Sequence, residues 1–205
     1  DGTMMGVFTF ASIPEIIGDK ALKVKHADFV FIGAIGQQQI VHVRKDILPG
    51  GDPKRFVEIT KVFKSAGHAP SSSKDIAIKL TLGLLGLKHE HVTGFKSAGD
   101  IRRAILQNSI QYTEDSLTGY YAAVYPTLIK TGISVPLWHV GVNTKDGGLA
   151  HAKTVEDSIP TFLEVYRSKY GPKAVPSGVA WQAYRLLAST RQTLRIIVAP
   201  KGIPK

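Results

Sequence analysis

The stretch from Gly67 to Leu106 constrains the fold of this chain more than any other part. It predicts a loop, a helix, a short strand, a second loop and a second helix, in that order. Ser72 and Asp75 form a capping-box pattern ahead of an apolar run, which begins the first helix, and Ser97 with Asp100 begins the second in the same way. This alternation of strands and helices predicts an α/β fold.

Three adjacent hydroxyl side chains, Ser71, Ser72 and Ser73, lie at the first of these helix starts. Free backbone N–H groups and the positive end of the helix dipole favour an anion there, and the hydroxyls can donate further hydrogen bonds. Open α/β sheets bind ligands where strand ends meet helix starts, so the two helix starts predict a site for a small polar ligand. The same serines would also serve as ordinary helix caps, and Asp75 in the first turn would repel an anion.

Composition narrows the possible functions. The chain has 205 residues, 43% of them hydrophobic, which is enough to build one large domain or two small lobes with a substantial core. It contains no cysteine, which excludes disulfides, thiolate metal sites and cysteine nucleophiles. The formal charge of +10 raises the question of nucleic acid, but the basic residues are dispersed, so we expect no nucleic-acid partner.

The rest of the chain continues the alternation of strands and helices. Strands are expected at residues 4–10, 29–35, 40–44, 109–114, 133–141 and 193–199. Asp52 and Pro53 predict a helix that runs to about Phe63, and another helix is expected at residues 117–129. Pro160 and Pro176 each stand where a helix can begin.

Two motifs suggest an acyl-serine enzyme as an alternative. Ser71 and Lys74 form an S-x-x-K pattern at a helix start, and residues 130–132 read K-T-G. Serine penicillin-recognising enzymes combine these motifs, with the lysine activating the serine. The S-D-N element of those enzymes is missing here, and the K-T-G precedes its strand, so we expect no enzyme activity.

Other reactive side chains have competing interpretations. Glu114 and Asp115 follow a predicted strand and could act as an acid/base pair, or they could cap the helix that begins near Leu117. His89 and His91 would share a strand face, but no third ligand for a metal lies nearby in the sequence. The glycines do not have a dinucleotide-binding spacing. We therefore expect neither a metal nor a cofactor.

An ordered series of short motifs makes the chain recognisable. Asp1-Gly2-Thr3 precedes the first strand, residues 67–75 form a Gly- and Ser-rich loop, and residues 92–95 read V-T-G-F. Residues 160–164 read P-T-F-L-E, and residues 199–204 read A-P-K-G-I-P. The series covers nearly the whole chain and resembles the substrate-binding proteins of the tripartite tricarboxylate transporter family, the Bug-type extracytoplasmic solute receptors. One departure is Asn108, which stands where the family often has a glycine.

The resemblance implies a type II periplasmic binding-protein fold, in which two α/β lobes joined by hinge strands close on a ligand. It places residues 1–44 in the first lobe, residues 45–189 in the second, and residues 190–205 in a strand that returns to the first. The glycine-rich ligand loop of the first lobe would lie upstream of Asp1, so we expect a fragment with a complete second lobe and a partial first lobe. A signal peptide is expected upstream as well.

The resemblance also implies a function. The chain would be a periplasmic receptor that captures a small carboxylate, either an organic acid or an amino acid, and delivers it to the membrane permease subunits of a tripartite transporter. The predicted ligand contacts are Ser12 from the first lobe and Ser71, Ser72, Ser73, Phe95, Lys96, Ser97, Glu114 and Ser116 from the second. An alternative with a similar fold is the effector-sensing domain of a transcription regulator. Without the rest of the first lobe, apolar surface near residues 4–10 and 196–198 would be uncovered, which predicts self-association.

Overall fold

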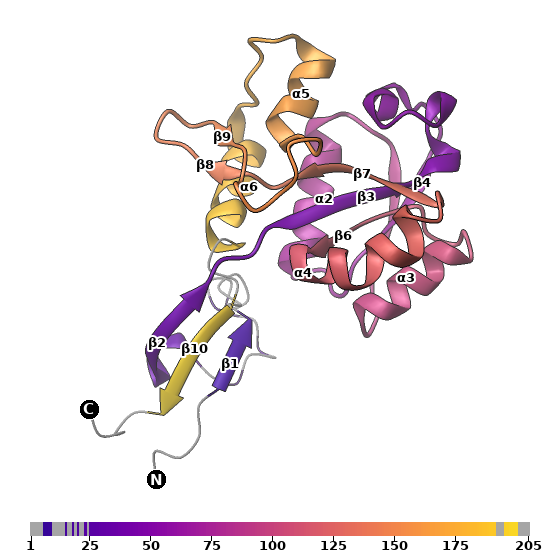
Figure 1. The fold of residues 1–205 in the computed structure, drawn as a ribbon. Coiled ribbons are helices and arrows are strands. Elements are labelled where there is room, and N and C mark those ends of the chain that lie inside the picture. Colours follow the sequence, from indigo (N-terminus) through magenta and orange to yellow (C-terminus); the bar gives the residue numbers. More distant parts are fainter. Residues whose placement is uncertain are drawn as a thin grey trace.

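The computed structural model describes residues 6–9, 25–191 and 195–200, together with the single positions 15, 18, 20 and 23. Its largest element is a mixed five-stranded sheet (Figure 1). The strands lie in the order β5 (His89–Val92), β4 (Phe63–Ala66), β6 (Tyr112–Ser116), β3 (Gln39–Arg44) and β7 (Ser134–His139). β4 is parallel to β5 and β6, whereas β3 is antiparallel to β6 and β7. The carboxyl ends of β4, β5, β6 and β7 therefore share one edge of the sheet, which we call the carboxyl edge.

Helices cover both faces of this sheet. On one face lie α2 (Ser73–Leu84), α5 (Phe162–Tyr170) and α6 (Gly178–Arg191). The apolar cluster on this face includes Val41, Tyr112 and Trp138 from the sheet and Ile78, Phe162 and Tyr184 from the helices. Trp138 and Phe162 are fully buried, with ring centroids 5.6 Å apart. Truncating such a buried aromatic side chain typically costs about 3 to 5 kcal/mol, so this cluster is a main source of stability.

The opposite face is covered by α3 (Ala98–Leu106) and by a continuous helix built from α4 (Leu117–Gly119) and a π-helical segment, Tyr120–Ile129. Their apolar cluster joins the sheet residues Ile40 and Ala66 to Ile101, Ile105, Tyr120 and Val124. Successive side chains of β6 point to opposite faces of the sheet, so this strand contributes to both faces. Tyr112 and Glu114 face α2, whereas Thr113 and Asp115 face α3.

A second, smaller sheet lies apart from the first (Figure 1). It contains β1 (Gly6–Thr9), β10 (Arg195–Pro200) and β2 (Phe29–Ile35), with β10 in the middle and antiparallel to both neighbours. Residues 36–38 connect β2 to β3, and so join the two sheets. We call these residues the junction.

The remaining elements are short. β8 (Val142–Asn143) and β9 (Leu149–Ala150) form a hairpin after β7. Short 3₁₀-helices occupy His26–Asp28, Lys45–Ile47, Pro49–Gly51 and Pro53–Glu58.

Most of the expected elements are present, and two expectations are wrong. The helix expected from Pro53 to Phe63 is a 3₁₀-helix that ends at Glu58, and Phe63 begins β4. The β-branched residues between positions 57 and 62 favour extended backbone, which explains the early end. The strand expected at 109–114 is displaced to Tyr112–Ser116, because β6 pairs along its whole length with β3. β3 is hydrogen bonded within the five-stranded sheet, and the lobe boundary after residue 44 that the resemblance implied stays a prediction.

Asn108 follows the end of α3 with a φ of 56°, which is the left-handed region. Its N–H donates to Ile105 O at 3.0 Å, and the N–H of Ser109 donates to Ala104 O at 2.9 Å, so the turn ends the helix as a glycine would. Asparagine tolerates this conformation better than most residues.

Candidate functional site

Four helix starts lie at the carboxyl edge of the main sheet. All four are capped by a hydroxyl side chain: Ser72 for α2, Ser97 for α3, Ser116 for α4 and Thr161 for α5. The first three each follow a strand of this sheet, and Thr161 forms a bridge with His139 at the end of β7. The structure thus brings together the predicted contacts Ser71, Ser72, Ser73, Phe95, Lys96, Ser97 and Ser116 at one edge, whereas Glu114 is buried within β6. Ser12 lies outside the described residues. Contact of any of them with a ligand stays a prediction.

The loop before α2 is organised by a carboxylate of the chain itself. Asp75 is fully buried and accepts hydrogen bonds from the backbone N–H groups of His68 and Ala69, at 2.8 and 3.2 Å, and from the hydroxyl of Ser72. Its second oxygen lies 2.8 Å from Nε2 of His91 on β5. A bound anion would accept hydrogen bonds from the same donors at this loop. The carboxylate of Asp75 therefore already uses some of the donors that an anion would need.

Asp75 is held in its ionised form. Burial alone would raise the pKa of its carboxyl, but hydrogen bonds from His91, Ser72 and the two backbone N–H groups hold the pKa far below its usual value. A methyl group at Gly67 would lie 2.2 Å from this carboxyl carbon, so only glycine fits at that position. The Gly- and Ser-rich loop is thus shaped around a fixed negative charge.

The second helix start is tied to the first. Nδ1 of His68 donates to Phe95 O at 2.9 Å, and the N–H of Gly94 donates to His68 O at 3.0 Å. Ser97 caps α3, with its hydroxyl 2.7 Å from the carboxylate of Asp100. The two loops are therefore hydrogen bonded to each other, and Lys96 on the second loop is exposed to solvent.

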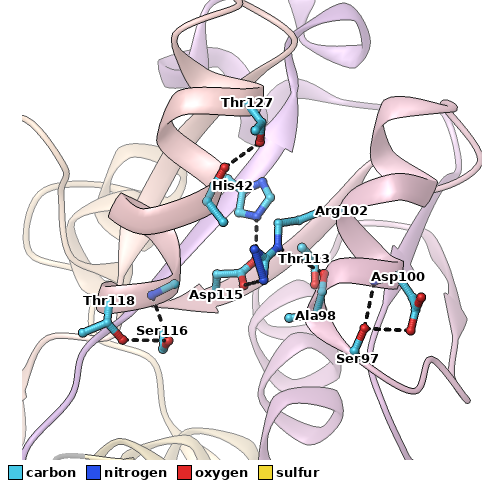
Figure 2. A network of polar contacts seen from close by, with 12 residues as sticks. His42, Ser97, Ala98, Asp100, Arg102, Thr113, Asp115, Ser116, Thr118 and Thr127 are labelled. Atoms are coloured by element: carbon cyan, nitrogen blue, oxygen red, sulfur yellow. Dashed lines mark hydrogen bonds and ion pairs between the residues drawn. The ribbon is translucent and has the colours of Figure 1, made fainter.

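A buried charge network lies beneath the start of α4 (Figure 2). Asp115 on β6 is 4% exposed, and its carboxylate lies 3.3 Å from Nε2 of His42 and 3.6 Å from the guanidinium of Arg102. Burial would raise the pKa of Asp115, but the hydrogen bond and charge of His42, with the charges of Lys74 and Arg102, lower it. Glu114 is also buried, at 3% exposure, on the other face of β6.

Asp115 and Glu114 therefore lie within the strand, and neither is the cap of α4, which is Ser116. Sequence reasoning missed both partners of Asp115. A signal was present, because His42 stands in an otherwise apolar strand pattern, QIVHVR. Such an isolated polar residue on a buried strand requires a partner.

The junction is clamped to the turn after β7. Oε1 of Gln38 accepts from the N–H of Gly141 at 3.1 Å, and Nε2 donates back to Gly141 O at 3.4 Å. The side chain of Gln37 donates to the hydroxyl of Thr118, next to the cap of α4. An open groove of about 290 Å³ lies here, lined by Gly36, Gln37, Gln38, Val142, Ala152, Lys153 and Thr154. None of these residues was predicted from the sequence.

The segment that forms the other wall of this groove is held by His139, at the end of β7. This side chain is fully buried, and its Nδ1 donates to the carbonyls of Ile159 and Pro160, both at 3.0 Å. Nε2 accepts from the N–H of Ala152 at 3.1 Å. Burial lowers the pKa of His139, as does the nearby His151 ring, 4.3 Å away between centroids, so the imidazole is neutral.

The alternatives that involve chemistry find little support in this geometry. The K-T-G motif at residues 130–132 precedes the amino end of β7, whereas Ser71 follows the carboxyl end of the parallel β4, so the two motifs lie at opposite edges of the sheet. Ser65, His91 and Asp75 form a hydrogen-bonded chain, with Ser65 Oγ 2.9 Å from His91 Nδ1. Ser65 is fully buried on β4, out of reach of a substrate, so this chain stabilises the loop.

The described part of the chain lacks two kinds of feature, a cluster of metal ligands and a membrane-spanning helix. It contains no group of three or more His, Asp or Glu side chains that could hold a metal. None of its helices is both long and apolar enough to cross a membrane.

No model of a protein family and no curated protein sequence matches this chain. Several solved structures, however, are similar to this chain. A TctC solute-binding protein from Polaromonas, solved without ligand, matches all of this chain with a TM-score of 0.55 and 17% identity. MatC from Rhodopseudomonas palustris, solved with bound malate, matches 98% of it with a TM-score of 0.58 and 14% identity. The periplasmic binding protein BugD matches all of it with a TM-score of 0.61 and 14% identity.

The chain spans 59%, 58% and 59% of the length of these three proteins. Their agreement confirms the resemblance drawn from the motif series and the α/β class of the fold. The chain therefore has the fold of the TctC- and Bug-type periplasmic solute-binding proteins.

Proposed function

We propose that this chain belongs to a periplasmic solute-binding receptor that captures a small carboxylate and delivers it to the permease subunits of a tripartite transporter, without catalysing a reaction. The observation that carries the proposal is the convergence of four hydroxyl-capped helix starts at the carboxyl edge, beside the junction of the two sheets. Open α/β sheets bind ligands at such an edge, and helix starts favour anions.

The comparisons support a carboxylate over other small ligands. The MatC structure contains malate, and a further similar structure, Rpa4515 from R. palustris, contains adipate. The formal charge of +10 on this chain also favours anions over cations in the surrounding solution.

Asp75 refines the proposal. Because this carboxylate already accepts from the N–H groups of His68 and Ala69, the ligand would contact the start of α2 through side chains, and the partly exposed hydroxyls of Ser71 and Ser73 are the candidates. Lys96 on the neighbouring loop would add a positive charge. These donors surround a fixed negative charge, so the site would require close geometric fit in addition to electrostatic attraction.

A thermal-shift screen tests the proposal. The panel contains organic acids, amino acids, sugars and nucleobases at millimolar concentration. A ligand present at about 100 times its Kd adds about 2.7 kcal/mol of stability, which raises the Tm of a chain of this size by roughly 5 to 10 °C. We expect that, of the compounds in the panel, only carboxylates will raise the Tm. Shifts with sugars or bases, and none with carboxylates, would contradict the proposal.

Variants then locate the site. Ser71→Ala combined with Lys96→Gln should reduce the shift caused by the best carboxylate. The matched control combines Ser168→Ala with Lys169→Gln on α5, away from the carboxyl edge. An equal reduction in both variants would place the ligand elsewhere.

A further inference from the structure

A separate groove lies beside β7, the strand at one end of the five-stranded sheet (Figure 1). Its walls come from β7, from the 3₁₀-helix Pro53–Glu58, and from α5 with the residues just before it. The volume is about 380 Å³, which is within the range of ligand pockets. None of the predicted ligand contacts lines this groove, which we call the β7 groove.

The walls of the β7 groove are mainly apolar. Leu137 on β7 and Val165 on α5 contribute aliphatic side chains, and the prolines Pro53, Pro136 and Pro160 line the remaining walls. Proline has no backbone N–H, so an apolar group placed here would cover no backbone donor at these three positions. The β7 groove is therefore suited to large apolar side chains of an occupant.

Hydrogen bonds within the chain hold both sides of the groove. The carbonyl of Pro160 accepts from the N–H of His139 at 2.9 Å, and a capping box between Thr161 and Glu164 fixes the start of α5. Across the groove, Asp52 caps the 3₁₀-helix by accepting from the N–H of Lys54 at 2.9 Å. A site with fixed walls loses little ordering entropy when it binds a partner.

The charges on the rim have the opposite sign to the charge of the chain. The rim carries two carboxylates, Asp157 and Glu164, and one ammonium group, Lys54, so its formal net charge is −1, whereas the chain has +10. Asp157 is exposed and makes no hydrogen bond or ion pair with the residues that the structure describes. Oε2 of Glu164 accepts from Thr161, and within the described ranges Oε1 accepts from no donor. A cationic group would therefore find acceptors on this rim.

The edge of β7 is poorly suited to the addition of a partner's strand. An exposed edge strand can pair with an extended segment through its backbone groups. However, Pro136 has no N–H to donate, and the end of β7 is already bridged, because His139 pairs with Thr161. An occupant would therefore dock through its side chains.

We propose that the β7 groove is a docking site for a protein partner, which inserts a segment where large apolar side chains lie next to arginine. The apolar side chains would fill the space between the three prolines, and the guanidinium groups would pair with Asp157 and Glu164. Arginine fits better than lysine, because its planar guanidinium can bond a carboxylate through two parallel hydrogen bonds. This docking site goes beyond the proposed function, because it does not involve the ligand contacts.

An NMR titration of the isotope-labelled 205-residue chain at low salt tests the docking site. The probe is the capped peptide Arg-Leu-Leu-Arg. One comparison peptide has citrulline, which is neutral and of similar shape, in place of both arginines, and another has serine in place of both leucines. The positive charge of the chain disfavours basic peptides elsewhere on its surface. We expect the probe to shift the backbone signals of Leu137 and Val165, and the serine peptide to cause no shift.

The citrulline peptide should bind about fourfold more weakly than the probe, because each exposed ion pair contributes a factor of about two. Asp157→Asn combined with Glu164→Gln should lower the affinity for the probe to that of the citrulline peptide. Glutamine at position 164 keeps the capping box of α5. The matched control, Asp146→Asn with Glu90→Gln, removes the same charge at two exposed positions outside the groove and should leave both affinities unchanged.

Equal affinities for the probe and the citrulline peptide, or equal effects of the two double variants, would overturn the proposal. Shifts confined to residues away from the groove would also overturn it. If no peptide bound while the Asp157 and Glu164 variant reduced self-association in light scattering, the occupant would be a second copy of the chain, and the proposed partner would be wrong. None of these outcomes depends on whether the chain binds carboxylates.

Discussion

At the residue scale, ionised carboxylates on buried positions organise the site. Asp75 and Asp115 each accept from a histidine on the sheet, Asp75 from His91 and Asp115 from His42. A buried charge is costly unless its hydrogen bonds are complete, and Asp75 has four donors around it. The loop that carries the proposed ligand donors therefore depends on this one carboxylate.

We expect Asp75→Asn to lower the free energy of unfolding by about 3 kcal/mol. The neutral amide oxygen is a weaker hydrogen-bond acceptor than a carboxylate oxygen. The NH₂ group of the asparagine would also face hydrogen-bond donors and have no acceptor there. Urea unfolding at pH 7.5 measures the loss. Asp157→Asn, at an exposed position, is the control and should change stability by less than about 0.5 kcal/mol. Equal stability of the two variants would show that the Asp75 network contributes little.

At the element scale, the imidazole of His139 adds side-chain hydrogen bonds to the backbone contacts that hold the segment after β7 against the sheet. His139 donates to the carbonyls of Ile159 and Pro160 and accepts from Ala152, so both ring nitrogens have partners only in the neutral form. Protonation of Nε2 would remove the acceptor for Ala152. The titratable groups facing this ring are His151, which disfavours its protonation, and Glu164 at the start of α5, which favours it.

This arrangement predicts an acid-sensitive contribution to stability. The pKa of His139 is lowered from its ordinary 6.5, so below about pH 6.5 the unfolded chain binds a proton that the folded chain does not. Stability is therefore retained above pH 6.5 and falls as the pH drops below it, by at most about 1.4 kcal/mol per pH unit for one group. Urea unfolding at pH 7.5 and pH 5.5 measures this loss.

His139→Gln separates this effect from other titrations. The glutamine amide can accept from Ala152 but does not titrate, so the variant should lose less stability than the natural chain between the two pH values, by at most about 1.4 kcal/mol. His89, whose pKa is also lowered by burial, contributes equally to both proteins. Identical pH dependence of the two would mean that His139 is not the group responsible.

At the scale of the whole molecule, the two sheets differ in how well they are covered. The five-stranded sheet is buried between helix layers, but on the smaller sheet Val30, Phe31 and Ile32 of β2 are 41%, 49% and 51% exposed. Side chains alternate along a strand, so apolar surface is exposed on both faces of β2. Such surface favours association with another copy of the chain.

We expect the chain to self-associate as its concentration rises, and the combination of Phe31→Thr with Ile32→Thr to reduce this. Threonine preserves strand propensity while removing apolar area. Light scattering over a concentration series measures the effect. Val179→Thr is the control, because Val179 on α6 is 82% exposed but lies outside the small sheet. A natural chain that stays monomeric throughout would contradict this prediction.

Local signals in the sequence determined the elements and the helix starts. Ser72, Ser97 and Thr161 cap their helices through contacts three residues away, which is why a pattern of four residues predicts them. The ordered motif series implied the fold through its resemblance to a known family. Where local signals conflict, as between Asp52 and Phe63, the prediction was wrong.

Tertiary structure decided the electrostatics of the site. The partners of Asp75, Asp115 and Gln38 lie 16, 73 and 103 residues away, at His91, His42 and Gly141. No local pattern specifies such pairs, because they form only when strands from distant parts of the chain take neighbouring places in the sheet. Strand order thus determines which charges are buried and paired.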